Sequence, residues 1–166
     1  MTPYKFYNWG PFVIETTAEP EFIDILLEKG NESREKNLDH RKALAGMIDN
    51  EYYYEDYESW FVPKFTPYIN LYVDALVSNW LPDRKIGKSW YAKSLWINYQ
   101  KANEYNSPHN HTGDLSFVIY LQVPEAIKKE HEMAKGQRNN SGPGAINFDF
   151  GVQMPCSVNH VNKFPQ

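Results

Sequence analysis

The sequence predicts an α+β fold in which helices are followed by an antiparallel sheet. In the first part of the chain, residues 1–88, apolar residues recur with helical spacing, whereas residues 89–166 alternate between apolar and polar positions as strands do. Helices first and strands afterwards indicate helices packed on one face of a sheet. We find no internal repeat and no second domain, so residues 1–166 are expected to form a single domain with a substantial core.

The chain is expected to begin with two short strands and one helix. Residues 4–6 and 12–15 have strand character, and the residues between them, 8–11, form a turn. Residues 19–29 carry apolar side chains on one helical face, and Gly30 is expected to end this helix.

The remaining helical part contains one strong pattern and one acidic stretch. A polar loop over 31–38 leads to Asp39, which can cap a helix over 39–48. Residues 51–58 are acidic and rich in tyrosine, and they predict a solvated helix end or loop rather than a functional patch. Over 65–80, apolar residues repeat every three or four positions. We expect this helix to cover a sheet rather than to bind a partner.

The second part of the chain reads mainly as strands. Strands are expected over 90–100, 115–123 and 145–150, and the start of a fourth over 158–164. A loop is expected over 102–108, and a short helix over 125–134 within a charged stretch. The 26 aromatic residues predict core packing first and a substrate groove second.

Composition excludes several classes of protein. A net charge of −4 argues against a broad nucleic-acid-binding surface, although a local basic patch remains open. The single cysteine, Cys156, excludes an internal disulfide and a multi-cysteine zinc module, and it fits a reducing cytoplasm. No apolar run reaches the ~20 residues of a membrane span, and no signal peptide is recognisable. The sequence also lacks a P-loop and a G-x-S-x-G nucleophile elbow.

The most informative segment lies just before the predicted strand at 115–123. His109 and His111 are two residues apart, a spacing that places both rings on one side of an extended chain, and Asp114 follows closely. Two histidines and one carboxylate are the ligands of a non-haem iron site. The competing interpretation is that these are polar residues of a surface loop. The other histidines predict less: His40 and His131 are expected to be exposed, and a single late histidine, His160, could approach the site.

Four segments together resemble a known protein family. They are Trp96-Ile97-Asn98-Tyr99, Pro108-His109-Asn110-His111, residues 115–124 and Gly144-Ala145-Ile146-Asn147-Phe148, and residues 39–48 resemble the family as well. They are similar to the 2-oxoglutarate- and Fe(II)-dependent oxygenases of T4-like marine and cyanobacterial phages. The resemblance covers most of the chain and is most specific in its middle block.

The resemblance implies a fold, a reaction and a set of site residues. The fold would be a double-stranded β-helix, or jelly roll, with N-terminal helices backing one sheet. The reaction would hydroxylate an unidentified substrate in the host cytoplasm and release succinate and CO₂. Fe(II) would be held by His109 and His111, with Asp114 as the carboxylate ligand, although the usual His-x-Asp spacing is absent. Asn98 and Tyr99 are candidates for contacting 2-oxoglutarate.

Two residues that such enzymes need are missing from the expected pattern. A distal histidine ligand and an arginine for the far carboxylate of 2-oxoglutarate would follow a segment that begins near Phe164-Pro165. Arg138 lies in a predicted loop, and the helical part holds the other arginines, Arg34, Arg41 and Arg84. The sequence therefore predicts a C-terminally truncated or split enzyme, with low turnover and a tendency to self-associate. The alternative is a non-catalytic jelly-roll protein with a binding or structural role in a phage.

Overall fold

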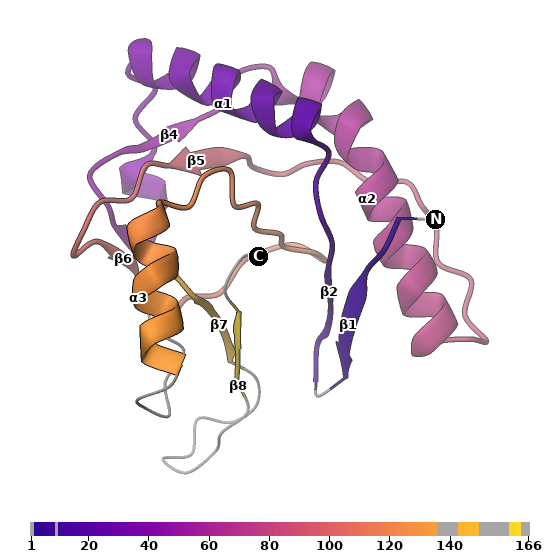
Figure 1. Cartoon of the computed structure of the whole chain (residues 1–166). Coiled ribbons are helices and arrows are strands. Elements are labelled where there is room, and N and C mark those ends of the chain that lie inside the picture. The colour runs from indigo at the N-terminus through magenta and orange to yellow at the C-terminus, as the bar shows by residue number, and fades with distance from the viewer. Residues whose placement is uncertain (1, 9, 136–142, 150–159, 164–166) are drawn as a thin grey trace. The chain divides into compact units, whose positions relative to one another are not determined.

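The computed structural model describes residues 2–8, 10–135, 143–149 and 160–163 (Figure 1). Its contacts divide the chain into two compact units. The first unit comprises Met1–Pro3 and Thr16–Val118, and the second comprises Tyr4–Glu15 and Ile119–Gln166. Each unit is described by itself below.

Two small antiparallel sheets and a helix frame the first unit. Strand β4 (Glu51–Tyr53) pairs with β5 (Trp96–Asn98), and β3 (Gly46–Met47) pairs with β6 (Tyr105–Asn106). Helix α1 (Pro20–Glu35) lies along β4, as Figure 1 shows. The contact is close because Gly30 faces β5: a Cβ atom at Gly30 would lie only 2.5 Å from Ile97 Cδ1. The buried Tyr54 hydroxyl, which donates to the Leu26 carbonyl at 3.0 Å, also ties α1 to the strands.

The core of the first unit is aromatic and lies where α1 meets the long helix α2 (Tyr57–Asn79). The Phe61 and Phe65 rings of α2 stack at 4.8 Å, and both contact Phe22 of α1. Phe117 closes the cluster, with its ring 4.4 Å from that of Phe65. Phe61 is fully buried, so this cluster provides much of the hydrophobic stabilisation of the unit.

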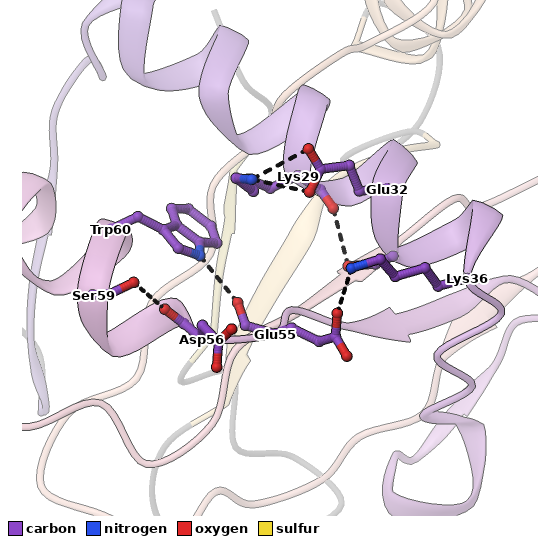
Figure 2. A network of polar contacts seen from close by, with 8 residues as sticks. Lys29, Glu32, Lys36, Glu55, Asp56, Ser59 and Trp60 are labelled. Carbon is purple, nitrogen blue, oxygen red and sulfur yellow. Dashed lines mark hydrogen bonds and ion pairs between the residues drawn. The ribbon is translucent and has the colours of Figure 1, made fainter.

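A polar network joins the end of α1 to the start of α2 (Figure 2). Lys36 donates to Glu55 at 2.7 Å, and this ion pair raises the pKa of Lys36. Trp60 donates its indole N–H to the Glu55 carbonyl at 3.0 Å. Asp56 has a left-handed backbone conformation, φ 47°, just before α2 begins. The network therefore fixes the turn between β4 and α2 beside the aromatic core.

The described residues of the second unit form two strand pairs and one helix. Strand β1 (Lys5–Asn8) pairs with β2 (Phe12–Glu15), and β7 (Ile146–Asp149) pairs with β8 (His160–Lys163), both antiparallel. Helix α3 (Glu125–Lys135) precedes β7. Tyr120 donates its hydroxyl to the Gly144 carbonyl at 3.2 Å. The strands predicted near residues 4–6, 12–15, 145–150 and 158–164 and the helix predicted over 125–134 are therefore confirmed within a few residues.

Several predicted helix boundaries are wrong. Helix α1 continues past Gly30 to Glu35; the glycine does not end the helix but allows its close approach to Ile97. The predicted helix over 39–48 is instead a short 3₁₀ turn, Arg41–Ala43, followed by β3. The N-cap residue of this turn is His40, not Asp39 as predicted, although the Asp39 carboxylate accepts the backbone N–H of Arg41 at 3.0 Å.

Helix α2 begins eight residues before the predicted start and contains Pro63 and Pro67 in its body. The apolar positions of α2 contact α1 and Phe117, and α1 lies along β4. The expectation that residues 65–80 cover a sheet stays a prediction. Pro63 and Pro67 each reduce the stability of the helix. The burial of Phe61 and Phe65, on either side of Pro63, outweighs this loss.

The strand predictions in the middle of the chain also need correction. The sequence predicts a solvated helix end or loop over 51–58; residues 51–53 instead form β4, whereas Glu55, Asp56 and Glu58 are exposed at the turn and start of α2, as predicted. The predicted loop 102–108 includes β6, and the strand expected over 90–100 is reduced to Trp96–Asn98. Residues 115–123 form no strand, because no described strand pairs with their backbone. The described chain is thus a mixed α and β structure with small antiparallel sheets. None of its described helices is long and apolar enough to cross a membrane.

Candidate metal centre

The structure brings His109 and His111 together. Their Nε2 atoms lie 3.0 Å apart, and the two ring centroids are 4.6 Å apart with an angle of 74° between the ring planes. Both residues are in a loop that follows β6, not on a strand as predicted, and both are exposed. The prediction that the two rings share one side of the chain is confirmed in a different backbone setting.

The tautomer of His109 follows from its hydrogen bond. Its Nδ1 atom lies 2.6 Å from the Ser107 carbonyl oxygen, which can only accept a hydrogen bond, so Nδ1 must carry the proton. In the neutral ring, Nε2 then keeps its lone pair and points at His111. Histidines that bind metals usually donate their other ring N–H to a carbonyl or carboxylate in this way.

His111 packs on Trp96 of β5. The two rings are roughly parallel, at 29°, with centroids 6.0 Å apart. His40 also lies beside this tryptophan: its ring is 6.2 Å from that of Trp96 and 6.0 Å from that of Tyr53. Partial burial lowers the pKa of His111, and the nearby His109 lowers it further. A neutral imidazole is the form that can bind a metal ion.

A second contact holds the histidine loop in place. Lys93 donates its ammonium to the Thr112 hydroxyl at 2.8 Å, and the Lys93 carbonyl accepts the Tyr57 hydroxyl at 3.2 Å. The loop is therefore attached both to the segment that enters β5 and, through Tyr57, to the start of α2. These contacts orient His111 before any ligand binds.

Asp114 does not complete a three-ligand cluster. It is exposed, and the described residues contain no group of three His, Cys, Asp or Glu side chains placed to hold one metal ion. Gly113, at φ 125°, turns the chain between Thr112 and Asp114. The role predicted for Asp114 as a metal ligand stays a prediction.

The two residues predicted to contact the cosubstrate point to opposite sides of β5. Asn98 follows Trp96 by two positions and shares its side, and its Oδ1 atom is buried without a hydrogen-bond partner among the described residues. Tyr99 faces α1, where its hydroxyl donates to Asn31 Oδ1 at 3.0 Å and the Arg34 guanidinium lies 4.6 Å from its ring centre. Burial raises the pKa of Tyr99. Only Asn98 therefore lies on the histidine side of this strand.

Glu51 is the polar residue that the sequence did not reveal. It is fully buried, and neither of its carboxylate oxygens has a hydrogen-bond partner in the described part of the chain. Burial raises its pKa, and the negative charges of Asp39 and Glu104 raise it further. The run of three tyrosines that follows Glu51 is the signal that could have identified a half-buried strand here.

The other predicted residues have mixed outcomes. His40 is half-buried rather than exposed, and His131 on α3 is buried at 3% exposure, so the expectation that both are exposed is wrong. His160 is in β8, but its side chain lies outside the description, as do Arg138 and Cys156 entirely. In comparisons with known proteins, the chain matches no family model, no curated protein and no solved structure.

Proposed function

We propose that the chain is a 2-oxoglutarate- and Fe(II)-dependent oxygenase, or a part of one, in which His109 and His111 hold the metal. The observation that carries this proposal is the pair of facing Nε2 atoms, 3.0 Å apart, together with the proton held on His109 Nδ1 by Ser107. The sequence resemblance described above supports the same reaction class, and it supports a jelly roll built around the described strand pairs.

The spacing of the two nitrogens fits adjacent ligands of one metal ion. Nitrogen ligands bind divalent metals such as zinc at about 2.1 Å, so two that occupy neighbouring octahedral positions are about 3 Å apart. The alternative for the same pair is a hydrogen bond in which His111 Nε2–H donates to His109 Nε2. Metal binding requires only that His111 adopt its other neutral tautomer.

We choose the third metal ligand and the residue that contacts 2-oxoglutarate from the chemistry of the side chains. A facial triad needs one carboxylate beside two histidines, and we propose Asp114, three residues after His111, for that role. We further propose that Asn98 contacts 2-oxoglutarate, since its buried Oδ1 lies on the Trp96 side of β5. Tyr99 was proposed for the same contact, but it already donates to Asn31 and is the weaker candidate. We propose a cytoplasmic location, in the host if a phage encodes the chain.

The chain's own residues orient the site. When bound, iron and 2-oxoglutarate would supply the oxidative chemistry. The Ser107 carbonyl holds the proton at His109 Nδ1 and so fixes the ring. Trp96 covers one face of His111, and the Lys93–Thr112 bond restrains the loop that carries both histidines. Such restraint reduces the reorganisation needed when a metal binds.

The first test is anaerobic titration of the purified chain with Fe(II) or Mn(II). Because the described residues supply two nitrogen ligands, we expect weak 1:1 binding that is lost in the His109→Ala/His111→Ala double variant. Asn110→Ala is the matched control, since this exposed residue lies between the two histidines and should leave binding unchanged. Equal binding by the double variant and the wild type would contradict the metal site.

The second measurement separates an enzyme from a binding protein. Succinate release from 2-oxoglutarate is followed with Fe(II), ascorbate and O₂. Turnover that requires iron and is abolished by the double variant would support the oxygenase. Metal binding without any succinate, also after addition of candidate substrates, would favour the non-catalytic phage protein.

A further inference from the structure

A second polar site lies where the two small sheets of the first unit meet. Glu51 begins β4, and its Cα partner across the β4–β5 pair is Asn98. Residues directly opposite each other in an antiparallel pair place their side chains on the same face, roughly 5 Å apart at Cβ. Glu51 Oε1, Glu51 Oε2 and Asn98 Oδ1 are all buried without a hydrogen-bond partner among the described residues.

A fourth oxygen comes from the β3–β6 pair. Gly46 and Asn106 are Cα partners there. A Cβ atom on Gly46 would lie 2.7 Å from Glu51 Oε1 and 2.7 Å from Asn106 Oδ1, so both oxygens lie close to the Gly46 backbone and to each other, and only glycine admits them there. Asn106 is exposed and Gly46 is half-buried, which gives the site an opening to solvent on this side.

The unpartnered oxygens at this site are acceptors, and no described side chain donates a hydrogen bond to Glu51. An ionised carboxylate in a protein interior costs several kcal/mol unless a cation or hydrogen bonds compensate it. No described lysine or arginine forms an ion pair with Glu51. The positive charge of Arg41 acts on Glu51 and lowers its pKa, but the Arg41 guanidinium is already bonded to both oxygens of Asp39, at 2.9 and 2.8 Å.

The surrounding charges are also negative. The carboxylates of Asp39 and Glu104 both act on Glu51, and both are held in place: Asp39 by Arg41, and Glu104 by the backbone N–H groups of Asp49 and Lys101, at 3.1 and 2.6 Å. A fixed negative potential and a set of oxygen acceptors favour a cation over an anion or an apolar ligand.

We propose that Glu51 and Asn106 bind a hard divalent cation of the Ca²⁺ type beside Gly46, with water completing the coordination. Carboxylate and amide oxygens are the ligands that Ca²⁺ takes in proteins, in flexible geometries completed by water, whereas Mg²⁺ needs a stricter octahedron and transition metals prefer nitrogen or sulfur. This site uses different side chains from the histidine pair and does not depend on the proposed oxygenase activity.

The test is a thermal melt and a calorimetric titration of the full purified chain with CaCl₂, after treatment with EDTA. We expect the melting temperature to rise with Ca²⁺ concentration, because a ligand that binds the folded state stabilises it. Glu51→Gln should weaken Ca²⁺ binding at least roughly tenfold. This variant is expected to fold, since the amide has the shape of the carboxylate and no charge to bury.

Two further variants keep the proposal falsifiable. Gly46→Ala places a methyl group 2.7 Å from both oxygens and should abolish the Ca²⁺-dependent rise, while Gly87→Ala, which meets no atom within 4 Å, should keep it. The His109→Ala/His111→Ala variant should also keep it, which separates this site from the histidine pair. A wild-type melting temperature unaffected by Ca²⁺, or a rise that survives Glu51→Gln and Gly46→Ala, would overturn the proposal.

Discussion

The first unit contains two interiors of opposite character. Between α1 and α2, the Phe22, Phe61 and Phe65 rings fill the space with apolar contacts. Around β4 and β5, the buried groups include the unpartnered oxygens of Glu51 and Asn98. The first interior contributes stability through buried apolar area, whereas the second reduces stability unless a proton, water or ligand satisfies its oxygens. Such a difference is typical of a scaffold beside a binding site.

The largest expected effect is in the aromatic interior. Phe61→Ala removes a fully buried ring that contacts Phe22, Phe65 and Phe117, and it should lower the free energy of unfolding by about 3–5 kcal/mol. The measurement is urea denaturation. Tyr91→Ala, at a ring that is 82% exposed, is the control and should change stability by less than about 0.5 kcal/mol. A small effect at Phe61 would show that this cluster is not the core.

A smaller loss of stability is expected where α1 packs against β5. Gly30→Ala gains helix propensity, about 1 kcal/mol, but its methyl group would meet Ile97 Cδ1 at 2.5 Å and the Tyr99 hydroxyl at 3.0 Å. Overpacking typically costs about 1–3 kcal/mol, so we expect net destabilisation of up to about 2 kcal/mol in urea denaturation. Gly87→Ala, which meets no atom within 4 Å, should be neutral or slightly stabilising. A stabilised Gly30→Ala variant would mean that α1 and β5 are less tightly packed.

Features formed by residues that are close in sequence could be predicted, whereas features that depend on distant residues could not. The apolar spacing over residues 65–80 identified α2, and turn residues with alternating patterns identified β1, β2, β7 and β8. Local patterns encode these elements because helical spacing and strand alternation are properties of residues that are close in sequence. The continuation of α1 through Gly30 could not be predicted, since the reason for glycine there is Ile97, 67 positions later in the chain.

The candidate site was predicted only where neighbours in sequence form it. His109 and His111 are two residues apart, so their convergence could be anticipated from spacing alone. Glu51 escaped notice because its burial depends on pairing with Asn98, and its acidic, tyrosine-rich surroundings suggested solvent. A contact between Trp96 and His111 likewise depends on the loop that follows β6. Long-range pairing, not local propensity, decides each of these positions.

The smallest expected effect is a pH dependence that reports on the polar interior. The pKa of Glu51 is raised above its ordinary value of 4.5 by burial and by the charges of Asp39 and Glu104. As pH rises above about 4.5, the unfolded chain releases this proton while the folded chain keeps it, so the folded state binds more protons and stability falls. The fall ends once the pH exceeds the raised pKa of Glu51.

Asp39 and Glu104 contribute with the opposite sign, because hydrogen bonds lower the pKa values of both carboxyls and their stabilisation is lost as pH falls. The difference between wild type and Glu51→Gln at each pH therefore isolates Glu51, since both proteins keep the other two carboxyls. Measured by urea denaturation in EDTA, the stability of the wild type relative to this variant should decrease from pH 4 to pH 7. A difference that stays constant over this range would mean that Glu51 is solvated or already paired. The interior around β4 and β5 would then hold no unpartnered polar group, like the aromatic interior between α1 and α2.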